Sequence, residues 1–383
     1  MPIYHQYSLF VDGRIHLEVQ LRVRSTLLAR VHVEGYRQIR SRLNRLDTRS
    51  VTEGPEKGIA PFSRYLYIGT GTLECPRPRE FWRVGSVARR LLVLPMSDVS
   101  KLRGVLLDLS EPIAKRTHAA FHLRTIGSAE CVEIIAEALK QRQDGELMRH
   151  ELAYILGQMQ NSIACDTLIG VLEDENDDVL VRHESAEALG AIGDIRVIDV
   201  LKKYVNHPAP EISETCIIAI DLLEWRTNGE QINSKGIYLS VDPAPPLGTN
   251  HSIENLQNDL MDNKLSLFQR YRAMFSLRDI NSDDSALALL QGFKDSSALF
   301  RHEIAYVLGQ MQRSVTAEGL MTVLENKEEH RMVRHEAAEA LGAIGGAAIE
   351  EVLGKYKDND DIVVVQSCEV ALDTIDYWVS NGF

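Results

Sequence analysis

The chain repeats itself over long stretches, and this internal duplication limits its fold more than any other feature. RHELAYILGQM at residues 149–159 returns as RHEIAYVLGQM at residues 301–311, and VRHESAEALGAIG at residues 181–193 returns as VRHEAAEALGAIG at residues 333–345. Within each copy the two histidines lie 33 residues apart, a period typical of solenoids built from paired helices. Each copy is therefore expected to contain four helical hairpins, and the two middle hairpins carry the His-Glu pairs.

The duplicated region begins near residue 105, and a segment of different composition divides it. Residues 227–252 are rich in Gly, Pro, Asn and Ser, a composition that predicts a linker. We therefore expect an N-terminal half over residues 96–226 and a C-terminal half over residues 253–383. The predicted fold class is all-α, an α-solenoid of helical hairpins in two pseudo-symmetric halves.

Residues 1–95 contain no repeat and are left as a basic extension without an assigned fold. Residues 1–100 hold 16 Lys or Arg against 9 Asp or Glu, so the net charge of −13 divides into +7 here and −20 for the rest. HLEVQLRV at residues 16–23 and RYLYIGTGTLE at residues 64–74 predict strands. The extension is either a small basic accessory domain or targeting arm, or a segment that is irrelevant to activity or lies outside the native protein, which would then begin at Met96.

Charge, apolar content and cysteine usage exclude several classes of protein. An acidic body attracts basic partners and repels polyanions, which argues against nucleic acid as a ligand of residues 101–383. No apolar stretch approaches the roughly 20 residues needed to span a bilayer, and charges interrupt the N-terminus where a secretory signal would be apolar. Five cysteines without a CxxC pair fit a reducing compartment. We therefore predict a cytoplasmic protein that does not bind membranes.

One repeat shows how the local sequence specifies a helix. Asp178 is placed to cap the start of the helix and Gly193 to end it. Apolar residues from Val181 onward fall on one stripe, which is expected to pack on the neighbouring repeat. His183 and Glu184 lie off this stripe near the first turn, so we expect them to project from the edge of the stack.

The four His-Glu pairs are the candidate functional residues, because packing alone does not require the same two polar residues in four helices. The pairs are His150 and Glu151, His183 and Glu184, His302 and Glu303, and His335 and Glu336. Imidazole and carboxylate without thiolate suit iron, manganese or zinc, and two histidines with one carboxylate suit non-haem iron. Two such sets facing each other favour a di-iron oxygenase.

Two other functions remain open from the residues alone. A two-zinc hydrolase would also use paired metal ions, although it gives no role to the additional acids. A metal-free scaffold that binds proteins along its concave face explains the repeat and the acidic charge. It does not explain the four intact His-Glu pairs.

A second set of polar residues lies one helical turn after each histidine, on the same helix face. These residues are Tyr154, Glu187, Tyr306 and Glu339. We predict that Glu187 and Glu339 accept hydrogen bonds from metal-binding histidines or contact a substrate amine. The tyrosines are expected to line the wall of the cavity, the alternative being that they only pack between helices.

The repeated RHE helices with their AYxLGQM and AEALGAIG tails, together with YLSVDPAPP at residues 238–246, resemble the deoxyhypusine hydroxylase family. The resemblance covers roughly residues 105–383. It implies a HEAT-repeat monooxygenase with two Fe²⁺ ions. The implied substrate is the deoxyhypusine side chain of translation initiation factor 5A. O₂ and an unknown electron donor would convert this side chain to hypusine.

The same resemblance implies a role for each member of the His-Glu pairs. The positions that match iron ligands are His150, His183 and Glu184 for one ion, and His302, His335 and Glu336 for the other. Glu151 and Glu303 match the two acids that engage the substrate amine and act in catalysis. All eight positions are intact, so an active enzyme is expected.

Overall fold

The computed structural model forms two units, a small sheet and a helical array, which are described separately. The described residues are 6–11, 15–23, 27–33, 99–229, 238–248, 251–358 and 361–380.

The N-terminal unit contains a three-stranded sheet in the order β1-β2-β3. The strands are β1 (Gln6–Val11), β2 (Ile15–Val23) and β3 (Leu27–Val33). β1 and β2 pair antiparallel, with Gln6 opposite Gln20, as their short connection requires. The strand predicted from HLEVQLRV is confirmed as β2, whereas RYLYIGTGTLE lies outside the described residues.

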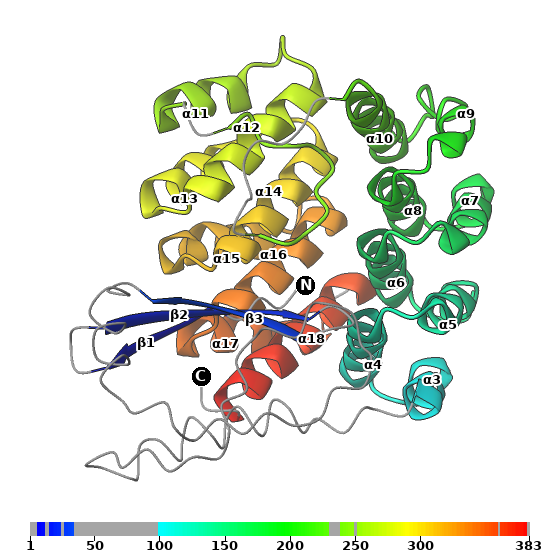
Figure 1. The fold of residues 1–383 in the computed structure, drawn as a ribbon, viewed down its shortest axis with the longest axis horizontal. Coiled ribbons are helices and arrows are strands. Elements are labelled where there is room, and N and C mark those ends of the chain that lie inside the picture. Colours follow the sequence, from blue (N-terminus) through cyan, green and yellow to red (C-terminus); the bar gives the residue numbers. More distant parts are fainter. Residues whose placement is uncertain are drawn as a thin grey trace, which may run out of the picture. The chain divides into compact units, whose positions relative to one another are not determined.

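The second unit is built from paired helices, with short 3-10 turns between several of them (Figure 1). The helices of the first half are α3 (Val99–Leu107), α4 (Ile113–Ile126), α5 (Ala129–Leu139), α6 (Glu146–Met159), α7 (Cys165–Glu173), α8 (Val179–Ile192), α9 (Ile198–Leu201) and α10 (Pro210–Thr227). Those of the second half are α11 (Ile253–Met261), α12 (Leu267–Ile280), α13 (Asp283–Leu290), α14 (Ala298–Met311), α15 (Ala317–Glu325), α16 (Arg331–Ile344), α17 (Ala347–Gly354) and α18 (Ile362–Ser380).

The helices of this unit form two layers in each half. Each odd-numbered helix contacts the even-numbered helix that follows it, and successive even-numbered helices pack side by side. The rows α4-α6-α8-α10 and α12-α14-α16-α18 face each other (Figure 1). The rows also touch at both ends, because α10 contacts α12 and α14 while α18 contacts α4 and α6. The predicted all-α solenoid of helical hairpins is confirmed, and its two ends meet.

A buried arginine links consecutive hairpins at Arg116, Arg149 and Arg270, of which Arg149 belongs to an RHE motif. Arg149 Nε donates to the backbone carbonyl of Leu139 at 2.9 Å, and its guanidinium pairs with the buried Asp177 of the following loop. The same two contacts occur at Arg116 with Leu106 and Asp144, and at Arg270 with Leu260 and Asp295. The arginine therefore satisfies a helix-terminal carbonyl and ties one repeat to the next.

Helix ends and close packing follow the local sequence. Asp178 accepts a hydrogen bond from the Leu180 N–H at 2.9 Å, and Gly193 ends the helix with φ of +83°. Both predicted caps are confirmed. Gly190 has a different role, since a Cβ there would lie 2.9 Å from the Cβ of Ala219. The glycine thus allows α8 and α10 to approach closely.

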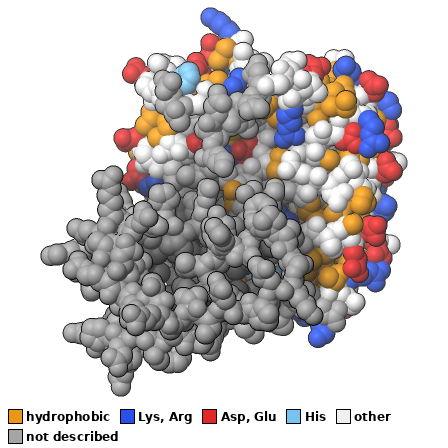
Figure 2. Space-filling model, viewed as in Figure 1, with side chains coloured by type: hydrophobic (Ala, Val, Ile, Leu, Met, Phe, Trp, Pro, Cys, Tyr) orange, Lys and Arg blue, Asp and Glu red, His pale blue; other side chains and the backbone are white. Residues whose placement is uncertain are grey.

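The visible face of the helical unit mixes charged and apolar side chains (Figure 2). Figure 2 shows Lys and Arg interspersed with Asp and Glu over the described helices of this face. Among the helices that the structure describes, none is both long enough and apolar enough to cross a bilayer.

Candidate metal centre

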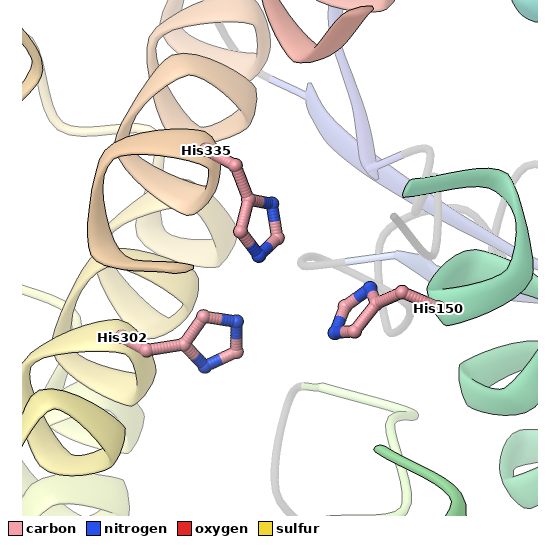
Figure 3. Close-up of side chains that lie close together, drawn as sticks. All are labelled: His150, His302 and His335. Carbon is pink, nitrogen blue, oxygen red and sulfur yellow. The ribbon is translucent and has the colours of Figure 1, made fainter. Parts of the chain in front are cut away.

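Four inner helices bring the His-Glu pairs together. In α6, α8, α14 and α16 the histidine is the fifth residue of the helix, so each ring leaves its helix at the same height. Because α6 packs beside α8 and α14 beside α16, each half presents two neighbouring rings. Figure 3 shows His302 and His335 pointing from adjacent helices toward His150 of the opposite half.

The four histidines form one cluster rather than two separate pairs. The ring centroids of His150 and His183 are 5.4 Å apart, and those of His302 and His335 are 5.2 Å apart. Across the halves, His150 lies 5.0 Å from His335, and His183 lies 5.6 Å from His302. One ligand atom each from His150, His302 and His335 falls within 4.8 Å of the others, as does one each from His150, His183 and Glu184. Metal ligands can therefore come from one half or from both.

The expectation that His183 and Glu184 project from the edge of the stack is wrong. His183 has no exposed surface and Glu184 is only 3% exposed, and the equivalent His335 is also fully buried. These side chains do lie off the stripe that packs on the neighbouring repeat. They are buried because the opposite row of helices covers the face on which they stand.

The cluster holds mostly neutral imidazoles. Burial lowers the pKa of His183, His302 and His335 well below the ordinary value, and positive charge on neighbouring histidines lowers it further. Burial also acts to lower the pKa of His150, but the Glu184 and Glu151 carboxylates outweigh it and raise that pKa. Neutral imidazole is the form that binds metal.

The buried histidines have donor atoms that no group in the described residues satisfies. His150 Nδ1 lies 3.2 Å from Glu151 Oε1, and His150 Nε2 lies 3.2 Å from Glu184 Oε2. The six ring nitrogens of His183, His302 and His335 make no hydrogen bond within the described residues. Leaving a buried polar atom unpaired costs about 1–3 kcal/mol. A metal ion would use several of these lone pairs at once, and the nitrogen and oxygen donors match iron, manganese or zinc. The residues present therefore fit a metal centre.

Four of the carboxylates lie beside particular histidines. The ion-pair distances are 3.2 Å from His150 to Glu151, 3.2 Å from His150 to Glu184, 3.5 Å from His302 to Glu336 and 3.6 Å from His335 to Glu339. The last two exceed ordinary hydrogen-bond lengths. All four acids therefore lie within 4 Å of a ring nitrogen of the cluster.

A cleft of about 450 Å³ of empty space, part of it open to solvent, lies between the two rows of helices. Its lining comprises His150, Glu151, Tyr154, Gln158, Glu184, Glu187, Val241, Pro243, His302, Glu303, Tyr306, Glu336 and Glu339. Burial raises the pKa of Glu187, Glu303, Glu336 and Glu339, because each carboxylate loses hydration. Such a concentration of acids favours a cationic ligand.

Hydrogen bonds continue along the cleft beyond the histidines. Tyr154 Oη and Tyr306 Oη lie 2.9 Å apart, and Gln310 Nε2 donates to Tyr306 Oη at 2.9 Å. Sequence reasoning missed Gln158 and Gln310. A signal was available, because both occupy the same place in the duplicated LGQM string.

Residues 238–248, which we call the connecting segment, lie within the region predicted as a linker. They form hydrogen bonds with both halves. In the first half, the Gln158 side chain hydrogen-bonds the backbone N–H and carbonyl of Val241 at 2.8 and 3.0 Å. In the second half, Arg278 donates to both carboxylate oxygens of Asp242 at 2.9 and 2.8 Å. Composition alone did not indicate this docking, which depends on residues distant in the sequence.

Comparison with known proteins identifies the repeat. A family model for HEAT repeats matches residues 146–221 and 286–373, and one for PBS lyase HEAT-like repeats matches residues 115–141.

The matches with curated relatives cover almost the whole length of each relative. A protein named deoxyhypusine hydroxylase from Danio rerio is 46% identical over 290 residues, covering 75% of this chain and 94% of the relative. Relatives of the same name from Drosophila melanogaster and Homo sapiens are 44% and 43% identical, covering 96% and 94% of their own lengths and 76% and 75% of this chain. The solved structure of human deoxyhypusine hydroxylase in complex with glycerol matches with a TM-score of 0.70 and 42% identity, over 77% of this chain and 99% of that one.

Proposed function

The chain belongs to the deoxyhypusine hydroxylase family, and from this premise we propose that it hydroxylates the deoxyhypusine side chain of translation initiation factor 5A, using O₂ at a pair of iron ions. The observation that supports this most directly is the single buried cluster formed by the four repeated His-Glu pairs. A metal-free scaffold has no use for such a cluster, in which the six ring nitrogens of His183, His302 and His335 have no hydrogen-bond partners among the described residues.

Six side chains are proposed to hold the metal. They are His150, His183 and Glu184 for one ion, and His302, His335 and Glu336 for the other. The close approach of His150 to His335 supports an arrangement in which both halves are needed for a complete site. When bound, the irons supply the redox chemistry by which O₂ is activated.

The remaining acids are proposed to bind and orient the substrate. Glu151 and Glu303 line the cleft from opposite rows of helices, where a carboxylate can receive an ammonium group. Both are almost fully buried, so water competes little for the amine. One oxygen atom of O₂ enters a C–H bond as a hydroxyl group, and the other leaves as water with two electrons and two protons from an external donor.

The charge distribution supports a basic protein substrate. Residues 101–383 carry a net charge of about −20, which favours encounter with a basic partner and its orientation. We place the reaction in the cytoplasm, where the cysteine content predicts the protein to reside.

The test measures oxygen transfer and metal content together. Purified protein is reconstituted with ferrous iron without oxygen, mixed with deoxyhypusine-bearing factor 5A, and exposed to O₂ with a chemical reductant. A gain of one oxygen atom in the substrate mass is expected only when iron and O₂ are both present. His183→Ala is expected to lower both bound iron and product.

His118→Ala is the matched control, because His118 pairs with Asp373 where α4 meets α18 and does not line the cleft. It should retain iron and activity. Stable binding of the substrate by iron-free protein, with no product under any metal condition, would support a scaffold. Activity with zinc and without O₂ would support a hydrolase.

A further inference from the structure

The cleft opens toward the C-terminal ends of the inner helices. His150 and Glu303, which line its deep part, are the fifth residue of α6 and the sixth of α14, and they are 3% and 2% exposed. Tyr154 and Gln158, the ninth and thirteenth residues of α6, also line the cleft and are half-buried. The helical rise places Gln158 roughly 12 Å along the helix from His150. A side chain that enters from solvent therefore passes the level of Gln158 before it reaches the histidines.

The connecting segment forms one wall of the cleft at this level. Among the described residues that line the cleft, the aliphatic ones are Val241 and Pro243, whereas the others are His, Glu, Tyr and Gln. Val241 is half-buried and Pro243 is buried. Because the duplicated strings do not include this segment, it places an apolar wall on one side of a cleft that is otherwise pseudo-symmetric.

Gln158 holds Val241 in this wall. The Gln158 side chain accepts a hydrogen bond from the Val241 N–H at 2.8 Å and donates one to the Val241 carbonyl at 3.0 Å. The equivalent Gln310 donates instead to Ser240 Oγ at 3.0 Å. A side-chain amide that bonds both backbone groups of one residue restricts the position and the orientation of that residue.

Contacts with α12 fix the rest of the wall. Arg272 Nε donates to the Pro245 carbonyl at 3.1 Å, and the Leu247 N–H donates to Ser276 Oγ at 2.7 Å. Ala244 has no exposed surface and belongs to the apolar core of the second half. The segment is therefore bound on both sides of Val241, so the apolar wall is a fixed part of the cleft.

We propose that Val241 and Pro243 contact the methylene groups of the substrate's aminoalkyl side chain, and that Gln158 is a positioning residue that holds Val241 against them. The inference rests on the proposed function and deepens it. Acids of the cleft can receive the amines of such a side chain, but the methylene groups between the amines gain only from apolar contact. An apolar wall on one side gives this flexible chain a defined path to the histidines.

The first experiment measures KM and kcat of Val241 variants in the iron-loaded full chain, with deoxyhypusine-bearing factor 5A as substrate. Val241→Ala removes apolar contact and should raise KM by about fivefold. Its kcat and bound iron should stay near wild type, because the contact is present in the bound substrate and in the transition state alike. Val241→Thr keeps the shape of the side chain but adds a hydroxyl group, and it should raise KM to a similar degree.

Leu239→Ala is the matched control. Leu239 belongs to the same segment and is aliphatic, but it is 49% exposed and does not line the cleft. Its KM should equal that of wild type. A wild-type KM in Val241→Ala, an equal rise in Leu239→Ala, or an effect of Val241→Ala confined to kcat or bound iron would each overturn the inference.

A double-mutant cycle tests the positioning role of Gln158. Gln158→Leu removes both hydrogen bonds to Val241 and should raise KM with bound iron unchanged. The double variant Gln158→Leu/Val241→Ala should have a KM close to that of the weaker-binding single variant, since both changes remove one contact. Effects that multiply in the double variant would overturn the role of Gln158. Wild-type enzyme that binds iron but forms no product would instead overturn the proposed function, and this inference with it.

Discussion

Tyr154 Oη and Tyr306 Oη lie 2.9 Å apart, although 152 residues separate them in the sequence. Each tyrosine stands one helical turn after a histidine of the cluster, in α6 and in α14. Their hydrogen bond therefore joins equivalent positions of the two halves across the cleft. It is one of the direct links that hold the two sets of proposed metal ligands in register.

Tyr306→Phe is expected to lower the free energy of unfolding by about 1–2 kcal/mol. The variant removes the hydrogen bond to Tyr154 and the one that Tyr306 Oη accepts from Gln310 Nε2. Chemical denaturation of the variant and of wild type measures the loss. A variant as stable as wild type would contradict this account.

Arg149→Ala is expected to lower the free energy of unfolding by about 3 kcal/mol. It removes a buried ion pair with Asp177 and leaves the Leu139 carbonyl without its hydrogen bond. Arg142→Ala provides a control, because Arg142 contacts the same Asp177 with a side chain that is 43% exposed. Because the Arg142 side chain is largely solvated, its pair with Asp177 should contribute only about 1 kcal/mol. Equal losses in the two denaturation curves would rule out the structural role of the motif arginine.

Asp242→Asn is expected to loosen the connecting segment from the second half. Arg278 is 2% exposed, and among the described residues Asp279 would be its one remaining carboxylate partner. The free energy of unfolding should fall by about 2–3 kcal/mol, and protease cleavage within residues 238–248 should become faster.

Asp283→Asn is the corresponding exposed control, since Asp283 pairs with Arg313 at 3.3 Å on the surface. It should change stability by less than about 1 kcal/mol. Unchanged cleavage in Asp242→Asn would show that the segment is held by other contacts.

The pH dependence of stability should include a contribution from Glu214. Burial raises the pKa of Glu214, although Ser297 Oγ donates to its carboxylate at 2.6 Å. The folded state then holds this proton more tightly than the unfolded state. The resulting stabilisation is fully present below the unfolded value of about 4.5 and is lost as pH rises through the folded pKa.

Glu214→Gln removes this titration. The stability of wild type relative to the variant should therefore be greater near pH 4.5 than near pH 8, as measured by denaturation at both pH values. A difference that stays constant with pH would show that Glu214 does not contribute to the pH dependence.

Much of the helical unit could be predicted from local sequence. The 33-residue period, the caps at Asp178 and Gly193 and the apolar stripes depend on neighbours three or four residues away. Those interactions are present in any single repeat. The same reasoning placed His and Glu at equivalent positions in four helices, and the strand at residues 16–23 also followed from its alternating pattern.

Only the tertiary structure decided what surrounds those residues. His183 and Glu184 are buried because the opposite row of helices covers them, a contact between segments far apart in the chain. The connecting segment docks on Gln158 and Arg278 for the same reason. A repeat motif specifies which side chain stands at a position, but its partners are set by how the two halves meet.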